Sequence, residues 1–207
     1  MRLATAPAAS SNSPVTKAEL RARLVAELRA AAPRREQRQA ASDAICRAIR
    51  RHPAWIAAKS VCAFLPLPSE PQIAPLWEDE HAPAFCFPRV RGDEVKLIRL
   101  DDPALLRRSN WRLEADELAA APIVEPGDVD LFLVPGLAFT ARGQRLGRGG
   151  GFYDRLLSKR SAHSTAIGIC FSQQIVTQLP REPHDQDVDA VITEHGLLAG
   201  AADHTEK

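Results

Sequence analysis

The sequence has no apolar run that approaches the roughly 20 residues needed to cross a bilayer as a helix. Its formal net charge is only +1, so overall charge gives no argument for binding to nucleic acid or to a membrane. The four cysteines (46, 62, 86 and 170) form no C-x-x-C pair, and Cys62 and Cys170 lie inside apolar runs, as buried thiols do. We therefore expect a protein of the reducing cytoplasm, where cysteines stay reduced.

Several familiar chemical motifs are also missing. No Gly-Lys-Ser/Thr occurs, which excludes a Walker A loop, and Phe152 stands where a dinucleotide fingerprint needs its third glycine. No serine lies in a G-x-S-x-G setting, and no histidines show metal-ligand spacing. The sequence thus offers no nucleophile–base pair, and any chemistry must come from other groups.

The chain has 207 residues with 45% apolar and 26% charged side chains, which is typical of one soluble globular domain. We expect a disordered tail at 1–15, a domain at 16–198 and a flexible tail at 199–207, without a signal peptide. Residues 1–59 hold twelve Lys and Arg against four Asp and Glu. Such an excess is typical of a solvated helix face, although it can also meet polyphosphate or nucleic acid.

Short apolar runs alternate with helical patterns along the chain. Leu20, Leu24 and Leu28 recur at helical spacing after a capping box formed by Thr16 and Glu19. The pattern predicts helices at 17–31, 34–51 and near 73–80, and strands at 60–65, 84–87, 94–100, 131–134, 165–171 and 190–193. Alternation of this kind predicts a single three-layer α/β/α domain with a mainly parallel central sheet.

A glycine-rich stretch at 136–154, GLAFTARGQRLGRGGGFYD, follows the strand predicted at 131–134 and leads into a helix start. Glycines let the backbone approach an oxyanion closely, and arginine forks match phosphate oxygens. A helix N-terminus adds free N–H groups and partial positive charge. The stretch therefore predicts a phosphate-binding loop, against the alternative of a solvated, mobile connection.

Ligands of open α/β sheets gather beyond the carboxyl ends of strands. Three stretches follow predicted strands in this way: the proline-rich loop with Glu70, the glycine loop, and 172–174. The acidic segment 184–189 precedes a strand instead, and from spacing alone Asp185, Asp187 and Asp189 compete as partners of Asp154 for a magnesium ion. Its alternative is a solvated acidic loop.

The segment PGLAFTARGQRLGRGGGFYDRLL (135–157) resembles the signature of the 5-formyltetrahydrofolate cyclo-ligase family, also called 5,10-methenyltetrahydrofolate synthetases. KAELR (17–21), FLPLPSE (64–70), FPRV (87–90) and EPHDQDVDAVITE (182–194) also fit that family. The chain departs from the family pattern with Pro-Gln-Ile at 71–73 and Ala82-Pro83. The resemblance implies ATP- and Mg²⁺-dependent closure of 5-formyltetrahydrofolate to 5,10-methenyltetrahydrofolate through an iminium phosphate, by a cytoplasmic monomer that binds no nucleic acid or membrane.

The resemblance also implies a role for each matching residue. Arg145, Arg148 and Tyr153 would be catalytic, and Asp154 and Asp189 would hold Mg²⁺. The residues that would face ATP are Lys17, Arg21, Arg145, Gly147, Arg148, Gly149, Gly150, Gly151, Phe152 and Tyr153. The residues that would face the folate are Leu65, Glu70, Arg148, Gly149, Gly150, Gly151 and Phe152.

Two other classes of function remain open on the residues alone. A non-catalytic nucleotide- or RNA-binding module would use the basic helix and the Arg/Gly loop, and its binding would weaken with salt. A phosphosugar isomerase or CoA-transferase-like enzyme would need a catalytic carboxylate, such as Glu70, but no ATP.

Overall fold

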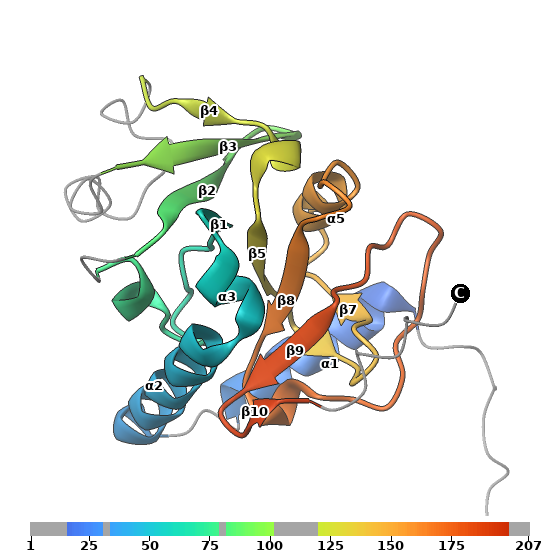
Figure 1. Cartoon of the computed structure of the whole chain (residues 1–207). Helices are drawn as coiled ribbons and strands as arrows, with labels where there is room; N and C mark the ends of the chain where they lie inside the picture. The colour runs from blue at the N-terminus through green and yellow to red at the C-terminus, as the bar shows by residue number, and fades with distance from the viewer. Residues whose placement is uncertain (1–15, 31–33, 79–81, 102–119, 199–207) are drawn as a thin grey trace, which may run out of the picture.

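The structure, a computed structural model, describes residues 16–30, 34–78, 82–101 and 120–198 (Figure 1). The tails predicted at 1–15 and 199–207 lie outside these ranges. Within the described residues, no helix is long and apolar enough to span a membrane. All four cysteines are buried free thiols.

An eight-stranded sheet forms the middle of the domain, in the order β10-β9-β8-β5-β1-β2-β3-β4. The five central strands from β9 to β2 are parallel, and the antiparallel strands lie at the two edges. The strands are β1 (Ser60–Cys62), β2 (Ala84–Arg91), β3 (Glu94–Leu100), β4 (Ile123–Val124), β5 (Leu131–Pro135), β8 (Thr165–Ile169), β9 (Ala190–Thr193) and β10 (Gly196–Leu197).

Helices cover both faces of the sheet because its buried strands are apolar on both sides (Figure 1). In β5, Leu131 and Leu133 pack into the cluster that contains Ile45 of α2 (Arg35–Arg51), next to the short helix α3 (Pro53–Ala57). Phe132 and Val134 point to the other face, into the cluster that holds the buried leucines of α5 (Phe152–Leu157). This arrangement confirms the predicted α/β class and its mainly parallel sheet.

A separate two-stranded hairpin rises from the carboxyl edge of the sheet. It consists of β6 (Ala138–Phe139) and β7 (Arg145–Leu146), and it begins directly after β5. Helix α1 (Lys17–Ala30) packs Leu20 and Leu24 against Ala138 and Leu146. The hairpin thus fixes the start of the glycine loop and ties the amino-terminal helix to it.

Most predicted elements are found, and four are corrected. The strand predicted at 60–65 ends at Cys62. The predicted strand 84–87 continues through Pro88 to Arg91, because β1 ends opposite Cys86 and leaves that side of β2 without a strand partner. The helix predicted near 73–80 is a 3₁₀ turn at Ala74–Leu76, and residues 79–81 lie outside the described ranges. The strand predicted at 165–171 ends at Ile169, where the 3₁₀ turn Ser172–Gln174 follows. A further 3₁₀ turn spans Pro126–Asp128.

Candidate functional site

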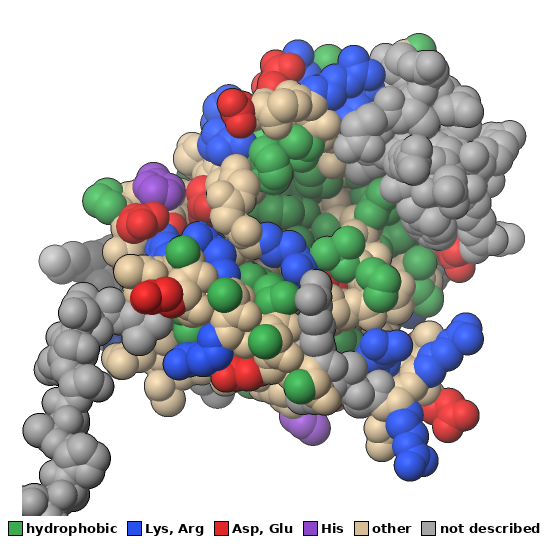
Figure 2. Space-filling model, turned by 180° about the vertical axis from the view of Figure 1, so that it is seen from behind, with side chains coloured by type: hydrophobic (Ala, Val, Ile, Leu, Met, Phe, Trp, Pro, Cys, Tyr) green, Lys and Arg blue, Asp and Glu red, His purple; other side chains and the backbone are tan. Residues whose placement is uncertain are grey.

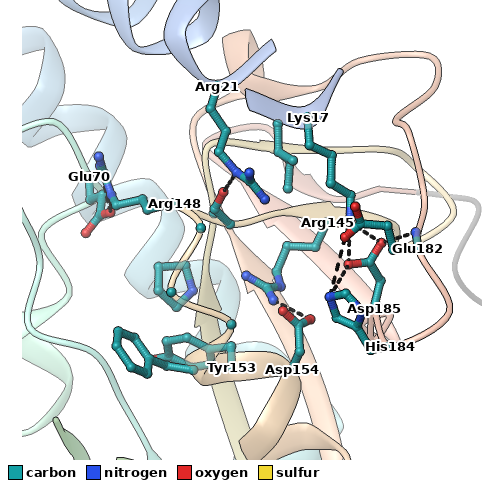
Figure 3. Close-up of a pocket in the computed structure, with 18 residues that line it drawn as sticks. Lys17, Arg21, Glu70, Arg145, Arg148, Tyr153, Asp154, Glu182, His184 and Asp185 are labelled. Carbon is teal, nitrogen blue, oxygen red and sulfur yellow. Dashed lines mark hydrogen bonds and ion pairs between the residues drawn. The ribbon is translucent and has the colours of Figure 1, made fainter. Parts of the chain in front are cut away.

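A cavity of about 410 Å³ opens at the carboxyl edge of the sheet. Its walls come from α1, the loop after β1, the hairpin, the start of α5 and the acidic loop before β9 (Figure 3). The lining residues are Lys17, Arg21, Glu70, Pro135, Gly136, Arg145, Leu146, Gly147, Arg148, Gly149, Gly150, Gly151, Phe152, Tyr153, Asp154, Glu182, His184 and Asp185. The topology therefore brings the first and last thirds of the chain together around the glycine loop.

Arg145 lies at the base of this cavity. Its side chain is only 4% exposed, and one guanidinium nitrogen donates to Asp154 Oδ1 over 2.7 Å. The guanidinium also lies 5.8 Å from the centre of the Tyr153 ring. Because β7 is held in the hairpin, this charge is fixed in position before any ligand arrives.

Lys17 reaches the cavity from the first turn of α1. Its ammonium donates to Asp185 over 2.6 Å and to Glu182 over 2.9 Å. Burial works against the ammonium, yet the two carboxylates raise the pKa of Lys17 overall. Burial likewise opposes the Asp185 carboxylate, but hydrogen bonds from Lys17 and from the Glu182 backbone lower the pKa of Asp185. Both groups are therefore charged at neutral pH.

Glu70 and Arg148 form a second charged pair on the opposite side of the cavity (Figure 3). The Glu70 side chain is 8% exposed, accepts a 3.0 Å hydrogen bond from the Leu67 backbone and pairs with Arg148 over 3.1 Å. A turn stiffened by Pro66, Pro68 and Pro71 holds the carboxylate in place. Arg148 is 43% exposed, so it remains accessible to a ligand.

The glycine loop at 147–151 needs glycine for steric and conformational reasons. Gly151 caps α5 with a φ of 64°, a left-handed conformation that other residues rarely adopt. At Gly147, a Cβ would lie 2.6 Å from an Arg145 nitrogen, and Arg21 Nε donates to the Gly147 carbonyl over 3.0 Å. Because α5 has only six residues, the predicted contribution of a helix N-terminus is small, and arginines and loop amides supply the positive field.

Two buried polar atoms in the described part of the chain have no hydrogen-bond partner: Arg145 Nε and the Tyr153 hydroxyl. Both belong to residues that line this cavity. Burial, together with the nearby Cys62 and Glu70, raises the pKa of Tyr153 well above its ordinary value, so its hydroxyl is neutral. Buried polar groups are nearly always paired, and two orphans at one cavity therefore indicate a polar ligand.

Comparison with known proteins agrees with this geometry. A family model described as the 5-formyltetrahydrofolate cyclo-ligase family matches residues 13–194. The chain is 30% identical over 200 residues to the 5-formyltetrahydrofolate cyclo-ligase of Mycolicibacterium smegmatis, covering 90% of this chain and 98% of the relative. It is 30% identical over 193 residues to the 5-formyltetrahydrofolate cyclo-ligase of Mus musculus, covering 86% of this chain and 93% of the relative. The chain belongs to the 5-formyltetrahydrofolate cyclo-ligase family.

Solved structures are similar over most of the chain. The NMR structure of Aquifex aeolicus 5,10-methenyltetrahydrofolate synthetase has a TM-score of 0.74 and 28% identity, covering 92% of this chain and 96% of that one. A synthetase from Mycoplasma pneumoniae, with a TM-score of 0.69 and 21% identity, shares the fold. The three-layer architecture is thus that of the cyclo-ligase family.

The predicted pairing of Asp154 with Asp189 is not found in this cyclo-ligase fold. Asp189 immediately precedes β9, its backbone bonds Ala166 at the start of parallel β8, and its carboxylate pairs with Arg160 and accepts from the Ala166 amide. A residue that precedes a parallel strand lies at the amino edge of the sheet, whereas the cavity lies at the carboxyl edge. Asp154 lies in the first turn of α5, whereas Arg160, the partner of Asp189, follows the end of that helix.

Some of the other residues predicted for the site line the cavity, and others do not. Leu65 packs against the core cluster next to α2 and is not among the residues that line the cavity. Asp187 pairs with Arg181, away from the cavity lining. Asp185, which sequence spacing left as a competitor, lines the cavity together with Glu182 and His184. The acidic composition of 182–189 indicates that this segment contributes to the site, but the path of the loop decides which of its carboxylates line the cavity.

Proposed function

We propose that this chain catalyses the ATP- and Mg²⁺-dependent conversion of 5-formyltetrahydrofolate into 5,10-methenyltetrahydrofolate, ADP and phosphate. The observation that carries the proposal is the cavity itself. Fixed basic residues, a glycine loop and the two residues with unpartnered buried polar atoms line one cavity, together with the Glu70–Arg148 pair. Family membership supplies the substrate class.

The charges of the cavity support a divalent cation as part of this site. Four basic side chains (Lys17, Arg21, Arg145 and Arg148) and four acidic ones (Glu70, Asp154, Glu182 and Asp185) line it. A triphosphate bound there would face carboxylates as well as cations. Asp154 Oδ1 accepts from Arg145 and from the Gln186 amide, while Oδ2 accepts no hydrogen bond within the described residues. Asp154 therefore fits Mg²⁺, which prefers carboxylate and phosphate oxygens, and Asp185 is an alternative carboxylate in the acidic loop.

In the proposed reaction the formyl oxygen attacks the γ-phosphorus of ATP and ADP leaves, which gives an iminium phosphate. N10 then attacks the former formyl carbon, the C–O bond breaks, phosphate leaves with that oxygen and N10 loses its proton. Mg²⁺ would neutralise charge on the phosphate oxygens. The protein needs no nucleophile, because such a transfer depends on positioning and charge stabilisation.

The residues of the cavity divide this work between its two sides. Lys17, Arg21 and Arg145 bind and orient phosphate oxygens, with amides of the 147–153 loop. Glu70 accepts hydrogen bonds from N–H groups of the pterin, and Arg148 lies between the two ligands, where it stabilises the phosphoryl group in transfer. The neutral Tyr153 hydroxyl orients a polar group rather than acting as a base, because its pKa is raised.

Magnesium dependence separates the roles of the two aspartates. We expect Asp154→Asn to raise the magnesium concentration needed for half-maximal activity by about tenfold or more, because a direct ligand matters at least as much as the groups around it. Asp189→Asn is its control: its carboxylate bonds Arg160 and the Ala166 amide. We expect an unshifted magnesium curve and a melting temperature lowered by about 2–4 °C, which corresponds to about 1 kcal/mol in a chain of this size. Identical magnesium curves for Asp154→Asn and the wild type would remove Asp154 from the metal site.

The decisive experiment mixes the purified chain with Mg-ATP and 5-formyltetrahydrofolate and follows the absorbance of the methenyl product. Product formation that requires all components supports the proposal. A nucleotide- or RNA-binding module would give no turnover and salt-sensitive nucleic-acid binding, and an isomerase or CoA-transferase-like enzyme would act without ATP. We further propose a cytoplasmic monomer that uses neither nucleic acid nor membrane, which sedimentation and fractionation would test; the four free thiols support a reducing compartment.

A further inference from the structure

A second cavity, of about 420 Å³, adjoins the first. Apolar side chains from four segments of the chain form most of its wall, together with four polar residues. Its lining residues are Val25, Leu28, Arg38, Leu67, Pro68, Ser69, Leu137, Arg148, Phe171 and Gln173. Figure 2, which shows the molecule from behind, has basic and hydrophobic side chains interspersed across the middle of this face. Apolar walls with a few polar groups are typical of sites for small organic ligands.

The two cavities share one wall. Arg148 lines both of them, and consecutive residues of one turn face different sides: Glu70 lines the first cavity and Ser69 the second. A ligand bound by Glu70 and Arg148 can therefore extend directly from the first cavity into the second. The second cavity is thus positioned to receive the remainder of a molecule whose head group binds at Glu70.

Arg38 is the unusual group in this second cavity. It is half-buried in the first turns of α2, and its guanidinium makes no hydrogen bond or ion pair within the described part of the chain. By contrast, Lys17, Arg145 and Arg148 each pair with a carboxylate. A cation near a helix N-terminus is also disfavoured by the helix dipole. No described residue therefore compensates this charge, and an anionic ligand would do so.

The chemistry of the wall specifies that ligand. Val25, Leu28 and Phe171 suit a flat apolar body, and a free guanidinium binds a carboxylate through paired hydrogen bonds. We propose that the second cavity binds the aminobenzoyl-glutamate part of the folate, with Arg38 pairing with a glutamate carboxylate. This inference rests on the proposed function, since the pterin must lie at Glu70. Arg38 thus becomes a residue that selects substrates carrying the glutamate.

Steady-state kinetics of Arg38→Gln test the inference, with Arg35→Gln as the matched control from the exposed side of the same helix turn. We expect Arg38→Gln to raise KM for 5-formyltetrahydrofolate by about tenfold or more, the effect of losing a charge-assisted hydrogen bond, and to leave KM for ATP unchanged. With 5-formyltetrahydropteroate, which lacks the glutamate, Arg38→Gln and the wild type should have the same KM. A purely structural role would raise KM for both substrates.

Binding of free 4-aminobenzoylglutamate to the full chain, followed by NMR, gives a readout that needs no turnover. We expect wild type and Arg35→Gln to bind it and Arg38→Gln to bind it at least about tenfold more weakly. If the wild type makes methenyl product but Arg38→Gln has an unchanged folate KM, this inference is wrong and the proposed function stands. If the wild type makes no product yet binds the fragment through Arg38, the proposed function fails while the anion site remains.

Discussion

Replacement of Arg145 by alanine is expected to lower kcat/KM for ATP by about 10²–10³-fold, the range found when a preorganised charge-stabilising donor is removed. The reason is position. The guanidinium is 4% exposed, fixed by the hairpin and by Asp154, and has one nitrogen without a partner at the cavity. ATP saturation curves at fixed 5-formyltetrahydrofolate measure the effect.

Arg142→Ala is the matched control, because Arg142 lies in the turn of the same hairpin, is exposed and does not line the cavity. Arg145→Lys keeps the charge but not the planar fork, and it should recover part of the activity. Because loss of one partner from a buried ion pair is destabilising, melting curves must accompany the kinetics. Coincident ATP curves for Arg145→Ala and wild type, both folded, would refute the assignment.

Replacement of Glu70 by glutamine is expected to weaken folate binding by about ten- to hundredfold while ATP binding changes little. Glutamine keeps the shape of the side chain but replaces one acceptor oxygen with a donor, which suits neither the Leu67 amide nor N–H groups of a pterin. It also removes the charge that holds Arg148. Calorimetry with each ligand separately measures the two affinities.

Glu194→Gln provides the control for this substitution. Glu194 is also a partly buried carboxylate at the carboxyl edge of the sheet, bonded to Ser172, but it lines neither cavity. We expect its folate affinity to match the wild type. Should Glu70→Gln bind folate as tightly as Glu194→Gln does, Glu70 serves only to order its proline-rich turn.

The glycine loop was predictable because its requirements are local. A left-handed conformation at Gly151 and the close approach of Arg145 to Gly147 exclude side chains there, so the composition of 143–151 records the backbone geometry directly. The central strands were predictable for a similar reason. A strand buried on both faces must be apolar throughout, as Leu131–Val134 is.

Strand ends and turn types were predicted less well because they depend on neighbours. Pro88 ends a strand by local rules, yet it lies inside β2, since only one side of the strand has a partner at that point. The sequence pattern also predicts that a helix dipole helps to bind phosphate, but α5 has only six residues, so its dipole contributes little. In both cases the surrounding chain changes the consequence of a local signal.

The acidic loop shows what only the tertiary structure decided. Three aspartates at alternate positions looked equivalent in the sequence, but the parallel register of β8 and β9 holds Asp189 at the amino edge, and the path of the loop brings Asp185 to Lys17 instead. Arg38 gave no signal in the sequence, because its significance lies in the absence of a partner among the described residues and in the apolar wall beside it. Local spacing specifies backbone conformation and burial, whereas a site built from distant segments depends on how the sheet and helices pack.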